Sequence, residues 1–278
     1  MIPFHFDYYK PETVKEAVEA YSALAQKNKS PVYYGGGSEL ISMARVGSIR
    51  TGVVIDIKSI PECTVLKVTG RKLLIGSAVT LSAIKESGCF PLLGTSAGRI
   101  ADHTNQCRIT LGGNVCGTII YRETVLPLLL ADASVKISGP SGTRSCPFSE
   151  AFRERIKLCE GELITSFLIG EEFSRSKYVH VKKTKGEKID YPLVTVAALM
   201  HNGHVRMAFS GVCGFPFRSQ LMEKALNESG VSASEKAENA ASLLPGAVLD
   251  NIDGSRDYRI FVLKNTVQNA LEALCGNI

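Results

Sequence analysis

Two short glycine clusters, far apart along the chain, constrain the fold of this sequence most. The first reads Tyr34-Gly35-Gly36-Gly37-Ser38-Glu39-Leu40, and the second reads Thr110-Leu111-Gly112-Gly113-Asn114. Glycine lacks Cβ and accepts positive φ, so successive backbone N–H groups in such segments can converge on one anion. Each cluster also carries hydroxyl or amide donors. Together they suit a dinucleotide whose pyrophosphate is held from both sides.

Neither cluster matches the two most familiar phosphate-binding motifs. A Walker loop requires Gly-x-x-x-x-Gly-Lys-Ser/Thr, and no lysine follows either cluster at that spacing. The Rossmann pattern requires Gly-x-Gly-x-x-Gly between a strand and a helix, with an acidic residue further on. Asp56 satisfies the acidic position, but the last glycine is missing after Gly37. The sequence therefore argues against both motifs.

Length and composition indicate a globular chain of two or three compact units. The chain has 278 residues, of which 45% are hydrophobic and 21% charged, so disorder is excluded. The net charge of +5 is scattered and lacks interleaved aromatic residues, which argues against nucleic-acid binding. The N-terminus does not read as a signal peptide, and no apolar stretch approaches the roughly 18 residues that span a bilayer. We therefore expect a soluble, cytoplasmic protein without a membrane segment.

Cysteines and histidines do not indicate a metal centre. None of the eight cysteines forms a Cys-x-x-Cys pair, the spacing on which zinc and iron–sulfur sites usually draw. Most are expected to be buried hydrophobic residues. The five histidines are dispersed, and no nucleophile–base pair stands out. We therefore expect no metal site and assign no catalytic residue.

The expected organisation is α+β in three units, residues 1–60, 61–175 and 176–278. In the first, a helix capped by Thr13 precedes strands at 32–34 and 53–57, with a short helix at 38–44. The second contains a hairpin at 65–75, helices at 80–86 and 91–100, and a strand at 135–137. The third combines an antiparallel sheet from 178–182, 194–200 and 204–210 with helices at 218–227, 234–244 and 256–275. Asn202-Gly203 predicts a tight hairpin turn.

The clusters and three later segments resemble one known family. Asp190-Tyr191-Pro192-Leu193-Val194 leads into Val196-Ala197-Ala198, Gly211-Val212 precedes Pro216 and Arg218, and Asp253-Gly254-Ser255 precedes Tyr258-Arg259. In this order, these segments resemble the flavin-binding medium subunit of the xanthine dehydrogenase and carbon monoxide dehydrogenase family of molybdenum hydroxylases. The resemblance covers nearly the whole chain.

The resemblance implies both a fold and a function. The fold would be the two-subdomain FAD-binding fold of the vanillyl-alcohol oxidase and p-cresol methylhydroxylase type, formed by residues 1–60 and 61–175. Residues 176–278 would form a C-terminal domain like that of the carbon monoxide dehydrogenase flavoprotein. The function would be electron transfer by FAD, from a small [2Fe–2S] subunit beside a large molybdopterin subunit to NAD⁺ or another acceptor.

The resemblance also implies which residues hold FAD. Tyr34–Leu40 and Thr110–Asn114 would enclose its pyrophosphate, with hydroxyl donors from Ser38 and Thr110 and an amide from Asn114. Alternatively, Ser38 caps a helix and Thr110 ends a strand. Glu39 would repel a pyrophosphate, so we expect it to turn away and cap its own loop.

Two positions depart from the family pattern. Thr124 stands where the family has an aspartate that helps to hold the adenosine or ribose, and Gln106-Cys107 replaces its Arg-Asn. For the flavin ring, the resemblance implies a lysine, either Lys185 or Lys188, together with Asp190; the alternative is an exposed loop. Two other functions stay open: a self-contained FAD-dependent oxidase of the same fold, and a scaffold subunit without flavin.

Overall fold

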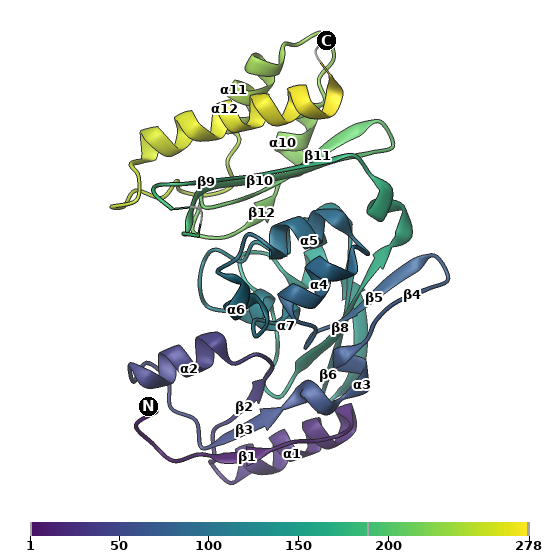
Figure 1. Ribbon diagram of the computed structural model, residues 1–278, viewed down its shortest axis with the longest axis vertical. Helices are drawn as coiled ribbons and strands as arrows, with labels where there is room; N and C mark the ends of the chain where they lie inside the picture. Colours follow the sequence, from purple (N-terminus) through teal and green to yellow (C-terminus); the bar gives the residue numbers. More distant parts are fainter. Residues whose placement is uncertain (1, 188, 277–278) are drawn as a thin grey trace.

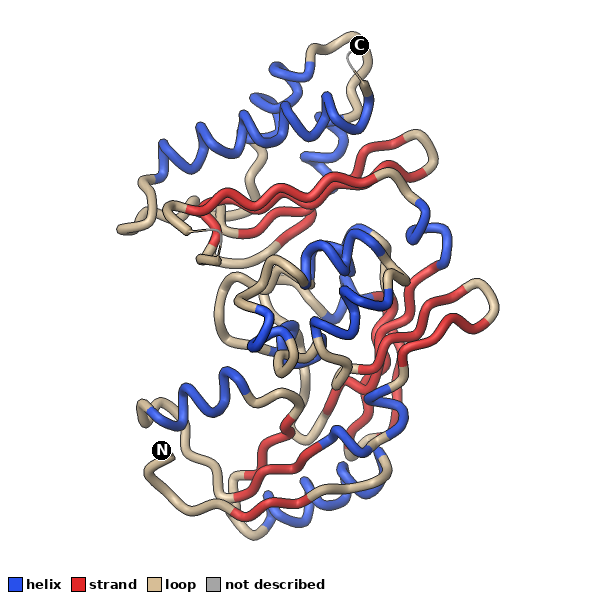
Figure 2. Tube along the Cα trace, in the orientation of Figure 1, coloured by secondary structure: helices blue, strands red, loops and turns tan. Residues whose placement is uncertain are grey.

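The computed structural model describes residues 2–187 and 189–276, which form three sheets, each within its own stretch of the chain. The three parts are stacked along the long axis of the molecule (Figure 1), from the N-terminal part at one end to the C-terminal helices at the other. Helices and strands alternate in the first part, whereas strands and helices separate into layers in the other two (Figure 2).

The first part is a three-stranded parallel sheet in the order β1-β3-β2. Its elements are β1 (Asp7–Tyr9), α1 (Val14–Gln26), β2 (Pro31–Tyr34), α2 (Ser38–Arg45), β3 (Val53–Asp56) and the 3-10 helix η1 (Ile57–Ser59). Helix α1 begins where sequence patterns predict, because the Thr13 hydroxyl accepts a hydrogen bond from the backbone N–H of Glu16 at 3.1 Å. The first glycine cluster follows the carboxyl end of β2, where α/β sheets commonly bind ligands.

The second part is a five-stranded antiparallel sheet in the order β4-β5-β8-β6-β7. Its strands are β4 (Leu66–Thr69), β5 (Lys72–Gly76), β6 (Ser134–Gly139), β7 (Gly142–Pro147) and β8 (Leu163–Gly170). Its helices are α3 (Pro61–Thr64), α4 (Leu81–Ser87), α5 (Pro91–Ala97), α6 (His103–Gln106), α7 (Leu111–Cys116), α8 (Val125–Leu130), α9 (Phe148–Ala151) and η2 (Glu171–Arg175). The second glycine cluster forms the start of α7.

The third part is a four-stranded antiparallel sheet in the order β12-β11-β10-β9. Its elements are β9 (Tyr178–Thr184), β10 (Pro192–His201), β11 (His204–Ser210), β12 (Phe217–Arg218), α10 (Gln220–Leu226), α11 (Ala233–Ser242) and α12 (Arg256–Cys275). Asn202 and Gly203 both have positive φ, 50° and 78°, as a tight hairpin turn requires. Among the described residues, no helix combines the length and apolar character needed to cross a bilayer.

Strand β10 is buried on both faces, which joins the third part to the second. Val194, Val196 and Ala198 pack with the helices of the third part, whereas Ala197 and Leu199 belong to the core of the second part. Side chains alternate across a strand, so these two sets point to opposite faces. Figure 1 shows α11 and α12 on one side of this sheet and α5 on the other.

Most of the expected elements are present, with a few differences. Strands β1, β7 and β8 were not predicted. Strands β1 and β7 are mostly exposed and lack an apolar pattern, whereas β8 is almost wholly buried and so shows no alternation of apolar and polar residues. Arg218, expected at the start of a helix, belongs to β12 and pairs with Ala208. We keep 60 and 175 as proposed domain boundaries, supported by the confinement of each sheet to one segment.

Candidate cofactor-binding site

The two glycine clusters lie against each other in the structure. A Cβ placed on Gly35 would lie 2.7 Å from the Thr110 hydroxyl oxygen, and one on Gly36 would lie 1.7 Å from the carbonyl oxygen of Arg108. Side chains are excluded from these positions by the chain itself. The glycines of the first cluster therefore let two segments, far apart in sequence, approach closely.

The first cluster supplies the donors of the site. Gly37 has φ of 70°, a left-handed conformation, and it caps the N-terminus of α2. The first N–H groups of a helix lack acceptors within the helix and carry partial positive charge, which favours an anion. The Ser38 hydroxyl is buried and has no hydrogen-bond partner among the described residues. Ser38 is the first residue of α2, so it does not cap the helix.

The second cluster forms the opposite wall rather than a donor loop. Thr110 caps α7 by accepting a hydrogen bond from Gly113 N at 3.1 Å, and it forms an isolated bridge with Thr80. The backbone N–H groups of the next residues are bonded within the chain: Leu111 to Val79, Gly112 to Ser77 and Asn114 to Thr110, at 2.8–2.9 Å. Side chains, not backbone amides, are therefore what this cluster offers to a ligand.

A cavity of about 330 Å³ lies between the clusters. Gly35, Thr110 and Gly113 line it, and a third wall comes from residues 158–164, which sequence reasoning missed. This wall is held to β2 because the Tyr33 hydroxyl donates to the carbonyl of Gly161 at 2.9 Å. The sequence feature that could have indicated this wall is Gly161, a glycine with φ of 76° at the turn before β8.

Glu39 points away from this cavity, as expected, but its partner differs from the prediction. Its carboxylate accepts a hydrogen bond from Thr118 N at 2.7 Å and another from the Thr118 hydroxyl. It therefore does not cap its own loop but ties α2 to the segment after α7. Both glycine clusters thus belong to one cross-linked unit.

Thr124 holds the side-chain amide of Asn114 through a hydrogen bond. It is fully buried, and its hydroxyl donates to the amide oxygen of Asn114 at 2.6 Å, which leaves the NH₂ group as the free end of that side chain. The neighbouring carboxylate, that of Glu123, is buried against Lys182 at 2.8 Å and accepts from Thr195 at 2.7 Å. Burial raises the pKa of Glu123, and the Lys182 ammonium opposes that shift.

The remaining predicted residues do not line this cavity. Lys185 and Asp190 lie in the loop between β9 and β10, where Lys185 Nζ donates to the carbonyl of Ile252 at 2.6 Å. Lys188 lies outside the described residues. Tyr34 and Leu40 line a second cavity beneath α2. The structure thus brings together Gly35, Thr110 and Gly113, with Ser38 at the adjoining helix start.

Comparison with known proteins identifies the family. Residues 4–170 match the FAD binding domain in molybdopterin dehydrogenase, which spans more than half of the chain. The chain belongs to this family. FAD is its cofactor, and the resemblance to the flavin-binding medium subunits is confirmed. As a dehydrogenase component, the chain is part of an oxidoreductase.

Two curated relatives match over most of their length. The carbon monoxide dehydrogenase medium chain of Hydrogenophaga pseudoflava is 26% identical, over 98% of this chain and 98% of the relative. The nicotinate dehydrogenase FAD-subunit of Eubacterium barkeri is 23% identical, over 80% of this chain and 84% of that subunit.

Two solved structures share the fold. Carbon monoxide dehydrogenase from Hydrogenophaga pseudoflava, in a form that lacks the Mo-pyranopterin moiety of the molybdenum cofactor, gives a TM-score of 0.87 at 23% identity over 99% of each chain. Quinoline 2-oxidoreductase from Pseudomonas putida 86 gives 0.85 at 22% identity, over 99% of this chain and 98% of that chain. The predicted α+β fold class is confirmed.

The residues present fit FAD. A pyrophosphate needs donors without a crowding side chain, and the start of α2 offers backbone N–H groups, an unpartnered serine hydroxyl and adjacent glycines. Among the described residues, no lysine or arginine lines the cavity, so we assign this role to the backbone and hydroxyl groups. Glu160 lines the same cavity and can accept hydrogen bonds from sugar hydroxyls.

Proposed function

We propose that this chain is the FAD-binding electron-transfer subunit of a molybdenum hydroxylase. The observation that carries the proposal is the meeting of the two glycine clusters at one cavity, with the donor-rich start of α2 facing the start of α7. Family membership supplies the cofactor, and this geometry supports the proposed position of FAD between the two clusters. Among the described residues, no group of three or more potential metal ligands accompanies the site.

Each part of the site has a separate task. Gly35–Glu39 provide backbone donors to the pyrophosphate, and Ser38 adds its hydroxyl. Thr110 and Gly113 form the facing wall. Thr124 bonds the amide oxygen of Asn114, so the NH₂ group of Asn114 points away from Thr124. Tyr34 and Leu40 support this loop from beneath, and Lys185 and Asp190 remain candidates for the flavin ring. When bound, FAD supplies chemistry that accepts electrons singly and releases them in pairs.

The proposed partners are a large molybdopterin subunit and a small [2Fe–2S] subunit. Two findings support them: the relative from Hydrogenophaga pseudoflava is a medium chain, and this chain covers 98% of it. Electrons would pass from the [2Fe–2S] subunit to this chain and then to NAD⁺ or another acceptor. The assembly would work in the cytoplasm.

One position departs from the family pattern for FAD. The carboxylate that the family pattern offers to the adenosine or ribose is absent at Thr124, whose hydroxyl is already bonded to Asn114. A scaffold without flavin was the alternative that this departure left open, but family membership gives FAD as the cofactor. The absorbance spectrum of the purified protein checks this, because only a flavin-bound subunit shows flavin bands.

Replacing Ser38 tests the proposed pyrophosphate site. Ser38→Ala removes a buried hydroxyl that has no partner within the described chain, so FAD affinity should fall about five- to tenfold while thermal stability without FAD is unchanged or higher. Ser42→Ala is the matched control, since the Ser42 hydroxyl bonds only back to the carbonyl of Ser38. FAD titration followed by fluorescence measures both. Equal affinity of Ser38→Ala and the wild type would place the pyrophosphate elsewhere.

Coexpression tests the partnership. With a molybdopterin subunit and a [2Fe–2S] subunit from its own genome, the chain should copurify, and substrate should bleach its flavin absorbance. Expressed alone, it should bind FAD without oxidising purines, other heteroaromatic compounds or aldehydes. Robust substrate oxidation by the isolated chain would instead favour the self-contained oxidase.

A further inference from the structure

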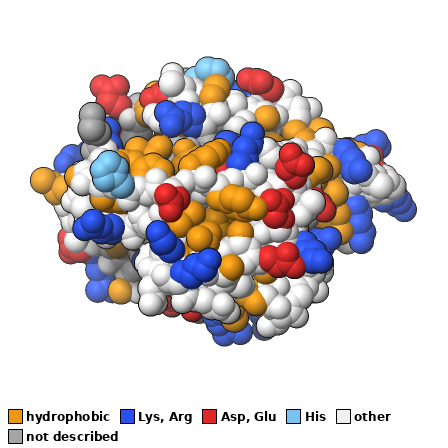
Figure 3. Space-filling model, turned by 90° about the horizontal axis from the view of Figure 1, so that it is seen from below, with side chains coloured by type: hydrophobic (Ala, Val, Ile, Leu, Met, Phe, Trp, Pro, Cys, Tyr) orange, Lys and Arg blue, Asp and Glu red, His pale blue; other side chains and the backbone are white. Residues whose placement is uncertain are grey.

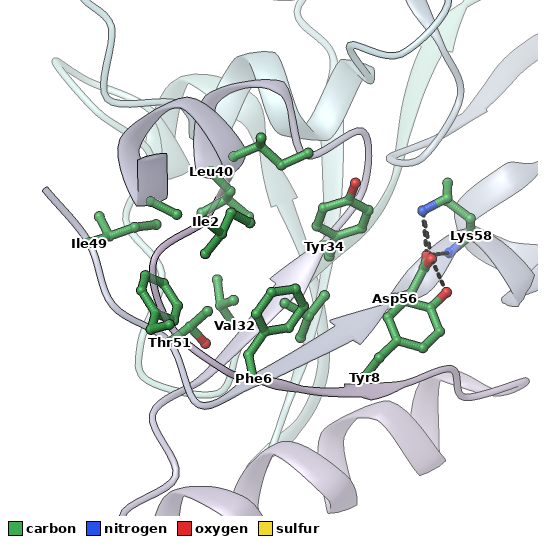
Figure 4. Close-up of a pocket in the computed structure, with 14 residues that line it drawn as sticks. Ile2, Phe6, Tyr8, Val32, Tyr34, Leu40, Ile49, Thr51, Asp56 and Lys58 are labelled. Atoms are coloured by element: carbon green, nitrogen blue, oxygen red, sulfur yellow. Dashed lines mark hydrogen bonds and ion pairs between the residues drawn. The ribbon is translucent and has the colours of Figure 1, made fainter. Parts of the chain in front are cut away.

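A second cavity, of about 360 Å³, lies beneath α2 (Figure 4). Val32 lines both cavities, so one strand separates them. The other lining residues come from the N-terminal segment, from α2 and from the strands of the parallel sheet. They are Ile2, Phe4, Phe6, Tyr8, Tyr34, Leu40, Ile41, Ala44, Ile49, Thr51, Val54, Asp56 and Lys58.

This cavity exists because one face of the parallel sheet is incompletely covered. Val53 and Ile55 pack with α1, and the alternation of side chains places Val54 and Asp56 on the opposite face. That opposite face is covered by α2, an eight-residue helix whose one buried residue is Ala44. A helix of this length leaves part of an apolar surface open.

The walls are mainly apolar and aromatic. In Figure 4 the rings of Phe6, Tyr8 and Tyr34 stand around the space, with Leu40 above them and Ile49 at the far side. The mouth is open to solvent, since Phe6 keeps 39% and Tyr8 56% of its surface exposed. Figure 3, which views this end of the molecule, shows hydrophobic side chains gathered between charged ones.

One end of the cavity is polar, and its two charged side chains, Asp56 and Lys58, neutralise each other. The Asp56 carboxylate, 3% exposed, accepts from the Tyr8 hydroxyl at 2.5 Å and from Lys58 Nζ at 2.7 Å. Lys58 Nζ also donates to the carbonyl of Gly35 at 3.0 Å, so all three of its donors are engaged. The Tyr8 oxygen keeps its acceptor capacity at this end, and the Tyr34 hydroxyl lies beside it in the lining.

The protonation state of Tyr8 agrees with its oxygen acting as an acceptor for a ligand. Its hydrogen bond to Asp56 raises the pKa of Tyr8 to about 12, so the phenol keeps its proton and directs it to the carboxylate. A ligand that bonds to the Tyr8 oxygen must therefore bring a donor of its own. The Asp56 carboxylate would repel an anionic ligand, and the Lys58 ammonium would repel a cation.

We propose that this cavity binds a neutral, planar aromatic molecule that carries one hydrogen-bond donor, either O–H or N–H. The volume lies at the low end of the range for small-molecule sites, and apolar walls with a few placed polar groups are their usual character. The donor would bond to the Tyr8 oxygen while the ring lies among Phe6, Tyr34 and Ala44. The site is separate from the proposed flavin site and does not require FAD.

Calorimetric titration with 1-naphthol tests this proposal, on the full chain with and without FAD. Saturable one-to-one binding is expected in both forms. The matched probe 1-methoxynaphthalene has the same rings without a donor. Its affinity should be about fivefold lower, which corresponds to the loss of one neutral hydrogen bond. Equal affinities for the two probes, or no saturation up to the solubility limit of 1-naphthol, would overturn the proposal.

Two pairs of variants locate the probe. Tyr8→Phe should weaken 1-naphthol about fivefold and leave 1-methoxynaphthalene unchanged; its control is Tyr9→Phe, because Tyr9 bonds Glu16 on the α1 side. Ala44→Phe should fill the cavity and lower the affinity for both probes at least tenfold, whereas Val46→Phe, at a site 77% exposed, should not. If Ala44→Phe does not fold, the Tyr8→Phe comparison still decides. Unchanged binding of 1-naphthol to Tyr8→Phe places it elsewhere and refutes the site.

Discussion

At the scale of single residues, the most unusual group is a buried arginine that has no carboxylate partner among the described residues. Arg259 is 0% exposed, and its guanidinium donates to the carbonyls of Leu193 and Gly211 at 2.8 Å and to the amide oxygen of Asn251 at 2.7 Å. The planar fork suits several acceptors at fixed positions. Arg259 therefore fastens the end of β10 to the segment that leads into α12.

We expect Arg259→Met to be strongly destabilising. The methionine fills similar space but removes the donor of the two buried carbonyls of Leu193 and Gly211, so the free energy of unfolding should fall by about 3 kcal/mol. Urea unfolding followed by circular dichroism measures this. Arg256→Met, on the exposed first turn of the same helix, should change it by less than about 0.5 kcal/mol. A similar small change at Arg259 would contradict the assigned role.

At the scale of elements, the first glycine cluster serves the contact between segments as well as the ligand. The sequence explains Gly36 by the room that a phosphate needs, whereas the structure shows that the carbonyl of Arg108 occupies the place of its Cβ. Substitution at Gly36 therefore disturbs the fold before it disturbs binding. Gly113 differs, because its Cβ would meet only the Thr110 hydroxyl, at 2.9 Å.

Gly36→Ala should accordingly lower the melting temperature of the FAD-free protein. Because the contact is with backbone that cannot rotate away, we expect a loss of up to about 3 kcal/mol, typical of overpacking. Gly186→Ala is the control, since no atom of the described residues lies within 4 Å of its added Cβ. Thermal unfolding of the two variants without flavin measures the difference. Equal melting temperatures would show that the clusters are not in contact.

Strand β9 carries a histidine that stays neutral in the folded protein. Neither ring nitrogen of His180 has a hydrogen-bond partner among the described residues, and burial lowers its pKa to about 4, assisted by Arg99 and Lys182. Unfolded, the imidazole takes up its proton near pH 6.5. Between these values the unfolded chain binds more protons, so stability is retained above pH 6.5 and lost as pH falls toward 4.

His180→Phe should remove this part of the acid sensitivity. The loss of unfolding free energy between pH 7 and pH 4.5 should be smaller in the variant by up to about 3 kcal/mol. Denaturant unfolding at each pH measures it. His204→Phe, at an exposed position of β11, should keep the wild-type pH dependence. Identical pH curves for His180→Phe and the wild type would show that folding does not lower the pKa of His180.

At the scale of the whole molecule, an ion pair lies buried at the junction of the second and third parts. Glu123 precedes α8, and Lys182 lies on β9; their side chains are 2% and 4% exposed. Lys182 also donates to the carbonyl of Arg99 at 2.9 Å. Asp132, bonded to Arg206 and Arg218, makes a second and more exposed link across the same junction.

A double-mutant cycle should reveal the coupling across this junction. Lys182→Met leaves the Glu123 carboxylate buried and unpaired, which should lower the free energy of unfolding by about 3–5 kcal/mol. Adding Glu123→Gln should recover part of that loss, because the charge is removed as well. The same cycle on Asp132 and Arg206 should give a smaller coupling, since Asp132 is 58% exposed. Additive effects at Glu123 and Lys182 would contradict the buried pair.

The sequence by itself determined the local elements and the family. Thr13 and Glu16 predict the start of α1, and Asn202-Gly203 predicts the β10–β11 turn, because these signals depend on neighbours along the chain. The two glycine clusters and the three later segments together resemble a flavin-binding family, and that resemblance implies the fold. Only the tertiary structure decided how the clusters meet, that residues 158–164 close the cavity, and that Glu39 bonds Thr118. Those contacts join residues far apart in sequence, and their geometry depends on strand order and packing, which local patterns do not encode.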